Sequence, residues 1–316
     1  MRKILIVKTT SMGDIVHALP AASDIARHFP GVRIDWVSEE SFAGIARLSS
    51  VVSTVHTVAF RRWRKTPLSA ATFREIRDAR RRLAAENYDA VIDLQGLIKS
   101  AWVARWTKVP AWGYDAASIK EPLASRFYAK TFAVSRREHA IVRCRKLAAL
   151  AFGYDYEDAE PVYGIDVKGA DDTRNVLFIP NTSRDEKLWD EANWVRLGES
   201  LVGRGFGLKI LWGSQAEHAR ARRLGEALGD SCRVMPRMGF EAIAHLMANA
   251  DAVIGLDTGL MHLAVALGRP AIGIYTGTPP ELTGLYGKNA VSLGARNASP
   301  SVSEVLDAAG RFLKCA

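Results

Sequence analysis

The 316-residue chain has few cysteines and no long apolar run. Its three cysteines, Cys144, Cys232 and Cys315, are scattered and form no Cys-x-x-Cys pair. This pattern argues against a disulfide framework and a zinc site, and it favours a reducing compartment. No stretch approaches the roughly 20 apolar residues that cross a bilayer. Lys8 ends the first apolar run, Ile4–Val7, too early for a signal-peptide core of about 7–15 residues. We therefore expect a cytoplasmic protein that meets membranes only at its surface.

Motifs of several common enzyme classes are also missing. The turn after the first apolar run, Lys8–His17, lacks the three glycines of a dinucleotide fingerprint and the Gly-Lys-Ser/Thr of a P-loop. The chain contains no Asp-x-Asp and no His-x-x-x-His, so a metal-held diphosphate has no support. It also lacks the Gly-x-Ser-x-Gly elbow of esterases. NAD-dependent, NTP-hydrolysing and serine-esterase functions therefore lose their main sequence support.

Positive charge is what the sequence has in excess, and one half of the chain carries it. The formal charge is +9, from 43 Lys and Arg against 34 Asp and Glu. Residues 1–165 hold 26 basic and 17 acidic residues, whereas residues 166–316 hold 17 of each. Residues 61–82 alone hold nine basic and two acidic residues. Such a run is often only a solvated helix face. The dense Arg61–Lys65 cluster, however, also fits a nucleic acid, an anionic sugar-lipid or a membrane surface.

Short apolar runs alternate with helical patterns in two series along the chain. In the first series we expect strands at Ile4–Lys8, Arg33–Val37, Val52–Val58 and Ala90–Asp93, and helices at Ile15–Phe29, Ala71–Glu86 and Leu97–Trp106. In the second we expect strands at Asn175–Ile179, Gly207–Trp212, Arg233–Met235, Ala252–Gly255 and Ala271–Ile274, and helices at Val195–Arg204, Glu217–Leu228, Glu241–Asn249 and Gly259–Leu267. Apolar strands separated by helices are typical of buried parallel sheets. The sequence thus predicts an α/β protein with two doubly wound domains.

The domain limits follow from an aperiodic stretch, Phe152–Thr173, which is rich in Asp, Glu, Gly and Tyr. We expect it to link an N-terminal domain of residues 1–165 to a C-terminal domain of residues 166–316. A terminal helix is expected at Ser303–Cys315. The sequence leaves open whether that helix packs back on the first domain.

The turn after the first strand is the first candidate site, and it contains Asp14. Ligands of open α/β sheets bind outside the carboxyl ends of strands, so this turn is expected to face a ligand. Asp14 lies where the following helix begins. Its carboxylate is placed either to face a substrate hydroxyl or merely to cap the helix, and position alone does not separate the two roles.

A second candidate site, Gly255–His262, follows an apolar strand and opens a helix. A helix N-terminus carries unpaired N–H groups and a partial charge of roughly +0.5, which suits a pyrophosphate. Thr258 adds a hydroxyl, Gly259 permits close approach, and His262 lies one turn further on. Taken singly, Asp257 would be a helix cap and His262 a core histidine, but together they favour a site.

The loop Pro180–Trp189 is the third candidate, because it also follows a predicted strand. It offers two hydroxyls and the point charge of Lys187, which suits a phosphate leaving group. Taken alone, it would be only a polar surface turn.

Together these motifs resemble the lipopolysaccharide heptosyltransferase I enzymes of glycosyltransferase family 9. The resemblance rests on six blocks in order along the chain: Lys8–His17, Arg61–Lys65, Asn87–Leu97, Glu121–Ala124, Lys187–Trp189 and Asp257–His262. It implies the GT-B fold, in which two Rossmann-like domains face a central cleft. The acceptor then binds the N-terminal domain, and the nucleotide-sugar binds the C-terminal one.

The resemblance also implies a reaction and a location. L-glycero-D-manno-heptose passes from ADP-L-glycero-beta-D-manno-heptose to Kdo of the lipid A inner core, with inversion and without a metal or other cofactor. The protein is then peripheral on the cytoplasmic face of the inner membrane.

The same resemblance gives roles to individual residues. Asp14 matches the general base. Lys187 matches a donor contact, and its charge is expected to stabilise the leaving ADP. The donor contacts are Thr182, Ser183, Lys187, Glu226, Met238, Asp257, Thr258, Gly259 and His262. The acceptor contacts are Ser11, Gly13, Arg61, Arg62, Arg64, Lys65 and Lys120. Two positions depart from the family pattern: Ser183 replaces a common threonine, and Lys120 replaces an arginine that would bind its partner bidentately.

Three alternative functions stay open on the sequence. A sibling heptosyltransferase that adds the second heptose is the nearest, although the basic cluster and Glu121–Ala124 argue against it. A nucleic-acid-binding protein would use the N-terminal arginines, but it would leave Asp257–His262 without a purpose, so no nucleic-acid partner is expected. A non-transferring nucleotide-sugar enzyme, such as an epimerase on the same fold, would not need an acceptor.

Overall fold

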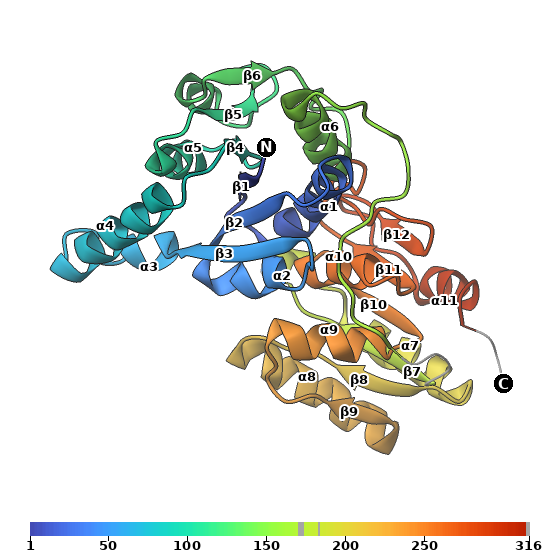
Figure 1. Cartoon of the computed structure of the whole chain (residues 1–316). Coiled ribbons are helices and arrows are strands. Elements are labelled where there is room, and N and C mark those ends of the chain that lie inside the picture. Colours follow the sequence, from blue (N-terminus) through green and yellow to red (C-terminus); the bar gives the residue numbers. More distant parts are fainter. Residues whose placement is uncertain (170–173, 183, 314–316) are drawn as a thin grey trace. The chain divides into compact units, whose positions relative to one another are not determined.

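A computed structural model of the chain describes residues 1–169, 174–182 and 184–313. The chain divides into two compact units, Met1–Asp166 and Val167–Ala316. Each unit is built on a six-stranded parallel sheet with helices between its strands (Figure 1). The predicted fold class, α/β with two doubly wound domains, is confirmed.

The first sheet has the strand order β3-β2-β1-β4-β5-β6. Its strands are β1 (Lys3–Val7), β2 (Arg33–Glu39), β3 (Val52–Val58), β4 (Ala90–Asp93), β5 (Ala111–Tyr114) and β6 (Lys130–Phe132). The helices are α1 (Met12–His28), α2 (Ala43–Arg47), α3 (Phe60–Trp63), α4 (Ala70–Ala85), α5 (Ile98–Ala104) and α6 (Ala140–Phe152), with 3₁₀ turns at Glu40–Phe42, Arg105–Thr107 and Pro122–Phe127. The central strands β1 and β4 are almost wholly buried, as expected for apolar strands covered on both faces.

The second sheet has the strand order β12-β11-β10-β7-β8-β9. Its strands are β7 (Asn175–Ile179), β8 (Gly207–Ile210), β9 (Cys232–Val234), β10 (Ala252–Leu256), β11 (Ala271–Tyr275) and β12 (Ala290–Gly294). The helices are α7 (Glu191–Gly203), α8 (Gln215–Leu228), α9 (Phe240–Ala248), α10 (Gly259–Ala266) and α11 (Val302–Gly310), with 3₁₀ turns at Asp185–Lys187 and Gly229–Ser231. The terminal helix α11 contacts α7, β11 and β12 of its own unit.

Most predicted elements are present, but the strands β5, β6 and β12 and the helices α2, α3 and α6 were not predicted. The predicted linker, Phe152–Thr173, begins where α6 ends, and Gly153 closes that helix in the left-handed region at φ 73°. From Gly153 to Gly169 the described chain forms no helix and only one isolated bridge, between Ile165 and Ser49. Within the described ranges, no helix combines the length and apolar character that a membrane span needs.

A buried ion pair ties α1, α6 and the segment after α6 together. The Arg145 side chain is 2 % exposed, and its Nε donates to Asp24 Oδ2 on α1 at 2.7 Å. The same guanidinium donates to the carbonyl oxygens of Ala159 at 2.8 Å and Glu157 at 3.1 Å. One arginine thus satisfies acceptors on three stretches of the first unit.

Replacing Arg145 with methionine should lower the free energy of unfolding by about 3–5 kcal/mol, because the buried Asp24 carboxylate then keeps only its longer pairing with Arg27 at 3.7 Å. Urea unfolding followed by circular dichroism measures the loss. Arg136→Met is the matched control, because Arg136 is exposed, and it should change stability by less than about 0.5 kcal/mol. Equal stability of the two variants would contradict the role given to Arg145.

Candidate functional site

The first candidate site lies at the carboxyl ends of β1 and β4, which are neighbours in the first sheet. Gln95 follows β4, and its Oε1 accepts from the Thr9 main-chain N–H at 2.6 Å and from the Thr9 hydroxyl at 2.7 Å. Gln95 Nε2 donates to Thr10 Oγ1 at 2.9 Å, and Lys99 Nζ donates to the same oxygen at 3.0 Å. These bonds hold the two loops together at the edge where open α/β sheets bind ligands.

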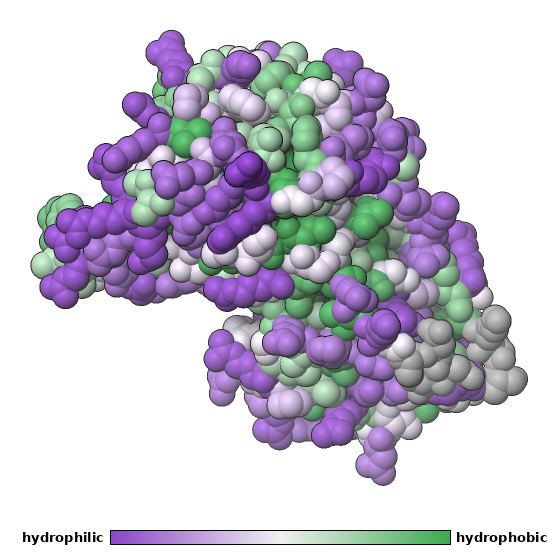
Figure 2. Space-filling model, viewed as in Figure 1, coloured by the Kyte–Doolittle hydropathy of each residue, from purple (hydrophilic) through white to green (hydrophobic). Residues whose placement is uncertain are grey.

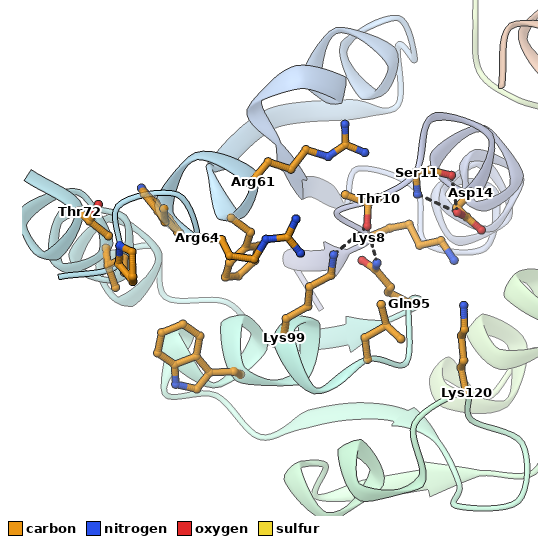
Figure 3. A pocket seen from close by; sticks show the side chains of 16 residues that line it. Lys8, Thr10, Ser11, Asp14, Arg61, Arg64, Thr72, Gln95, Lys99 and Lys120 are labelled. Carbon is orange, nitrogen blue, oxygen red and sulfur yellow. Dashed lines mark hydrogen bonds between the residues drawn. The ribbon is translucent and has the colours of Figure 1, made fainter. Parts of the chain in front are cut away.

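Asp14 lies in the first turn of α1, next to these loops. Its Oδ2 accepts from the main-chain N–H of Ser11 and from the Ser11 hydroxyl, both at 2.7 Å. The carboxylate therefore does cap the helix, which is one of the two roles that the sequence left open for Asp14. It is also partly exposed and lines a cavity, so the cap leaves it accessible to a ligand (Figure 3).

Glu39, the last residue of β2, fixes the start of the basic cluster. Its buried carboxylate accepts the main-chain N–H groups of Phe60 at 3.1 Å and Arg61 at 3.0 Å. A carboxylate at a helix N-terminus satisfies unpaired N–H groups and complements the positive end of the helix. The beginning of α3, and with it Arg61, is thereby fastened to the edge of the sheet.

These elements surround a cavity of about 750 Å³ in the first unit (Figure 3). Its described lining holds five cations, Lys8, Arg61, Arg64, Lys99 and Lys120, and one carboxylate, Asp14. Figure 3 shows the side chains of Arg61 and Arg64 extending in the same direction, toward the loop of Lys8 and Thr10, with Lys99 reaching toward Thr10. Burial lowers the pKa of Lys99. This part of the cavity suits a ligand with several negative charges.

The rest of the lining is largely apolar. It is formed by Phe60, Trp63, Pro67, Ile76, Leu97 and Trp102. Thr72, on the same helix as Ile76, lies on the opposite side of the cavity from Asp14 in Figure 3. The cavity therefore offers cations near Asp14 and apolar side chains toward α4.

The structure brings together four of the seven residues predicted to bind the acceptor. Ser11, Arg61, Arg64 and Lys120 line the cavity with Asp14. Gly13 is buried in the first turn of α1, and Lys65 is exposed outside the lining.

Arg62, the remaining predicted contact, is held by two carboxylates outside the cavity. It donates to Glu75 Oε1 at 2.7 Å and to both carboxylate oxygens of Glu40 at 3.1 Å. Hydrogen bonds to Glu40 and then Glu75 raise the pKa of Arg62. Its side chain is therefore engaged in the protein's own ion pairs.

Several lining or supporting residues had no individual role in the sequence predictions, although Lys8 and Thr10 lie in the candidate turn Lys8–His17 and Gln95 lies in the block Asn87–Leu97. The residues without an individual role are Lys8, Thr10, Glu39, Gln95, Lys99 and Trp102. Their place in the sequence could have identified three of them. Each of Lys8, Glu39 and Gln95 lies at or just after the carboxyl end of a strand.

The second candidate site lies at the carboxyl ends of β7, β10 and β11, which are adjacent in the second sheet. Lys187 Nζ and Asp257 Oδ2 form an ion pair at 2.6 Å, and the Thr278 hydroxyl donates to the same Oδ2 at 2.6 Å. The Thr182 hydroxyl donates to the main-chain oxygen of Asp257 at 3.2 Å. The loops after β7 and β11 thus converge on Asp257, which lies in the loop after β10.

The N-terminus of α10 directly follows Asp257. Thr258 is its N-cap in an extended conformation, and Gly259 is its first residue. The first N–H groups of a helix have no acceptor within it, so they are available to an anion. His262 lies one turn further on and is buried. A cation, a hydroxyl and a helix N-terminus therefore lie side by side, which is the chemistry that binds a diphosphate.

Two other predicted donor contacts are placed differently. Met238 lies in the loop between β9 and α9, at the same edge of the sheet. Glu226 is exposed, pairs with Arg222 at 3.0 Å, and lies about 16 Å along α8 from the end that starts at this edge. The structure therefore does not bring Glu226 to the second site. Ser183 lies outside the described residues.

Glu217 is the acidic residue of α8 that does lie at this edge. Its Oε2 accepts the main-chain N–H groups of Gly213 at 2.6 Å and Ser214 at 3.0 Å. The signal that identifies it is the capping box of Ser214 and Glu217.

Among the described residues, no three His, Cys, Asp or Glu side chains are grouped so that they could hold a metal ion. Metal independence of the reaction stays a prediction.

The sequence matches the family described as Glycosyltransferase family 9 (heptosyltransferase) over residues 76–308. It is 43% identical over 293 residues to the lipopolysaccharide heptosyltransferase 1 of Salmonella typhimurium. The aligned region covers 91% of this chain and 92% of that protein. The match to lipopolysaccharide heptosyltransferase 2 of the same species spans 102 residues at 29% identity, or 31% of this chain.

Solved structures of heptosyltransferases are also similar to this chain. The E. coli heptosyltransferase WaaC with ADP superposes with a TM-score of 0.92 at 38% identity, covering 98% of this chain and 100% of that one. The same E. coli protein with ADP-2-deoxy-2-fluoro heptose gives a TM-score of 0.89 at 39% identity, covering 98% of each chain. Because the family match spans most of the sequence and the similarity runs through both units, the chain belongs to glycosyltransferase family 9, the heptosyltransferases.

Proposed function

We propose that the protein transfers L-glycero-D-manno-heptose from ADP-L-glycero-beta-D-manno-heptose to Kdo of the lipid A inner core. The observation that carries the proposal is the cavity of the first unit, where Asp14 is the one carboxylate among five lining cations of the described chain. Kdo and lipid A bear carboxylate and phosphate groups, which arginine and lysine bind well. The near full-length similarity to proteins named heptosyltransferase 1 supports the choice of sugar and acceptor.

Asp14 is the general base in this proposal. As the acceptor hydroxyl oxygen bonds to the anomeric carbon of heptose, its proton passes to the Asp14 carboxylate. The bond from that carbon to the diphosphate oxygen breaks at the same time, and ADP leaves. A single in-line displacement inverts the anomeric centre. The hydrogen bonds from Ser11 hold the base in one orientation.

Lys187 and the start of α10 stabilise the departing ADP. Negative charge grows on the diphosphate as the bond breaks, and preorganised donors lower the energy of that state. Asp257 positions Lys187 through their ion pair, and the first N–H groups of α10 add donors. We propose that these groups make a metal ion unnecessary. Thr182, Ser183, Met238, Thr258, Gly259 and His262 complete the proposed donor contacts.

The alternative functions have less support. The match to a heptosyltransferase 2 covers under a third of the chain, so Kdo is the proposed acceptor rather than the first heptose. We do not propose a nucleic-acid partner. Because the acceptor is a lipid and the excess charge lies in the first unit, we propose peripheral association with the cytoplasmic face of the inner membrane.

The test is an assay of ADP release from ADP-heptose with and without Kdo-bearing lipid A. ADP release should require the acceptor and should accompany a product heavier by one heptose. Release without any acceptor, or transfer only to an acceptor that already bears heptose, would contradict the proposal.

The double variant Arg61→Ala/Arg64→Ala should raise the KM for the acceptor at least about tenfold, because each arginine supplies charge-assisted bonds to the acceptor. The Kd for ADP-heptose should not change. Arg62→Ala is the matched control, since Arg62 belongs to the same cluster but pairs with Glu40 and Glu75. An equal rise in KM for Arg62→Ala would mean that the cluster acts only through its total charge.

A further inference from the structure

The turn between α3 and α4 carries the most exposed hydrophobic side chain among those described. Leu68 is 86 % exposed, and Phe73, in the first turns of α4, is 58 % exposed. Figure 1 shows this turn at the outer end of the two helices, away from the sheet of the first unit. Single exposed hydrophobic residues are common, but grouped ones rimmed by polar residues mark an interaction surface.

Cations surround this pair on both sides. Arg64 and Lys65 precede Leu68, and Arg74 and Arg77 follow Phe73, all of them exposed. The two acids of this region are engaged, because Glu75 accepts bonds from Arg62 and from the Trp63 indole, and Asp78 pairs with Arg77. In Figure 2 the region of α3 and α4 is covered mainly by hydrophilic residues, with hydrophobic ones at its outer end.

The turn is also continuous with the apolar part of the cavity. Pro67 and Thr72, which line the cavity, directly precede Leu68 and Phe73. Trp102 also lines this part and is itself substantially exposed. Whatever the turn contacts is therefore held beside the entrance to the cationic cavity.

These features fit an anionic lipid bilayer better than a protein partner. The apolar part is formed by two side chains at a protruding turn, which is far less than a stable protein interface needs. Exposed cations on both sides of a small apolar turn are attracted to anionic headgroups while the apolar side chains enter the boundary of the acyl chains.

We propose that Leu68 and Phe73, at the turn between α3 and α4, insert into the surface of an anionic bilayer and hold the cavity at the level of the headgroups. A lipid-borne acceptor then reaches Arg61 and Arg64 without leaving the membrane. The identity of that acceptor rests on the proposed function, whereas the contact with the bilayer does not.

The test is co-sedimentation of the full chain with phosphatidylcholine vesicles that contain about one quarter phosphatidylglycerol. Leu68→Ser/Phe73→Ser should lower the partition coefficient at least about tenfold, since both apolar anchors are lost. The matched control is Leu150→Ser/Val162→Ser, because these residues of the same unit are 50 % and 65 % exposed but lie outside the turn. The control should bind as the unsubstituted protein does. Equal binding by the Leu68/Phe73 variant would overturn the proposal.

Two further measurements separate the remaining outcomes. On a Kdo-bearing acceptor stripped of its acyl chains, the Leu68/Phe73 variant should be as active as the unsubstituted protein, whereas its KM for vesicle-borne acceptor should rise about tenfold. Equal loss on both acceptors would overturn the proposal in favour of a role in the cavity. Inactivity of the unsubstituted protein on both acceptors would refute the proposed function and leave the vesicle result intact.

Sedimentation velocity tests the other outcome, in which the turn binds a second copy of the chain. A dimer that the Leu68/Phe73 substitution dissociates, without any vesicle binding, would assign the turn to that contact and overturn the proposal.

Discussion

Replacing Asp14 with asparagine should lower kcat by about 10²–10⁴-fold and leave the Kd for ADP-heptose nearly unchanged. The amide oxygen can still accept from Ser11, so the start of α1 is preserved, but the side chain cannot take the proton of the acceptor hydroxyl. The proposed donor site belongs to the other unit, so its affinity is not affected. Steady-state kinetics and calorimetric titration with ADP-heptose measure the two quantities.

Comparing asparagine with alanine separates the base from the helix cap. If Asp14 acts as the base, Asp14→Asn and Asp14→Ala lose turnover to a similar degree, and only the alanine variant also loses stability, by about 0.5–2 kcal/mol. If the cap alone matters, the asparagine variant keeps its turnover. That second pattern would remove Asp14 from the catalytic machinery.

Lys187→Ala should lower kcat by about 10²–10³-fold, because it removes a preorganised cation from the place where the ADP charge develops. It should also weaken ADP-heptose binding. The Asp257 carboxylate, which lies 2.6 Å from Lys187 Nζ, keeps its negative charge near the diphosphate once the lysine is gone.

The double variant Lys187→Ala/Asp257→Asn distinguishes these two effects. Removing the uncompensated carboxylate should restore much of the donor affinity, while kcat stays low because no cation faces the leaving group. Recovery of kcat together with affinity would show that Lys187 only neutralises Asp257 and has no part in the chemical step.

The sequence predicted the central strands of both sheets and the edge strands β3 and β9, but it missed β5 and β6 at one edge of the first sheet and β12 at one edge of the second. Uninterrupted apolar runs marked β1, β4, β7 and β10, which are almost wholly buried. The missed strands β5 and β6 are short and lie toward one edge, where β6 is partly exposed. The missed helix α6 buries a charged residue, Arg145, whose partners are distant in sequence. Short edge strands and buried charges give no clear hydrophobic period.

In the candidate site, the sequence predicted residues placed by a neighbouring strand and missed those placed by contacts with residues far away in the chain. Asp14, Lys187 and Asp257 were predicted as candidates because they lie in the loops that directly follow apolar strands. Lys99 was missed because its place in the cavity depends on a bond to Thr10, 89 residues away.

The position of Glu226, away from the second site, has a different physical origin. A helix that follows a parallel strand starts at the carboxyl edge of the sheet and runs away from it, so only its first turn reaches a ligand there. That rule selects Glu217, at the start of α8, over a residue in its last turn.

The residues that line the cavity of the first unit determine which kind of inhibitor it can bind. A volume of about 750 Å³ is within the usual range for small-molecule sites. The described part of its lining holds five cations, so a neutral compound leaves ammonium and guanidinium groups without counter-charges, and affinity requires an acidic group facing Arg61 and Lys99. The apolar lining at Trp102 accepts a hydrophobic substituent of the same compound. A compound of that kind is itself an anionic amphiphile, and moving its charge through the apolar interior of a bilayer is costly, so entry into cells is a requirement separate from its fit.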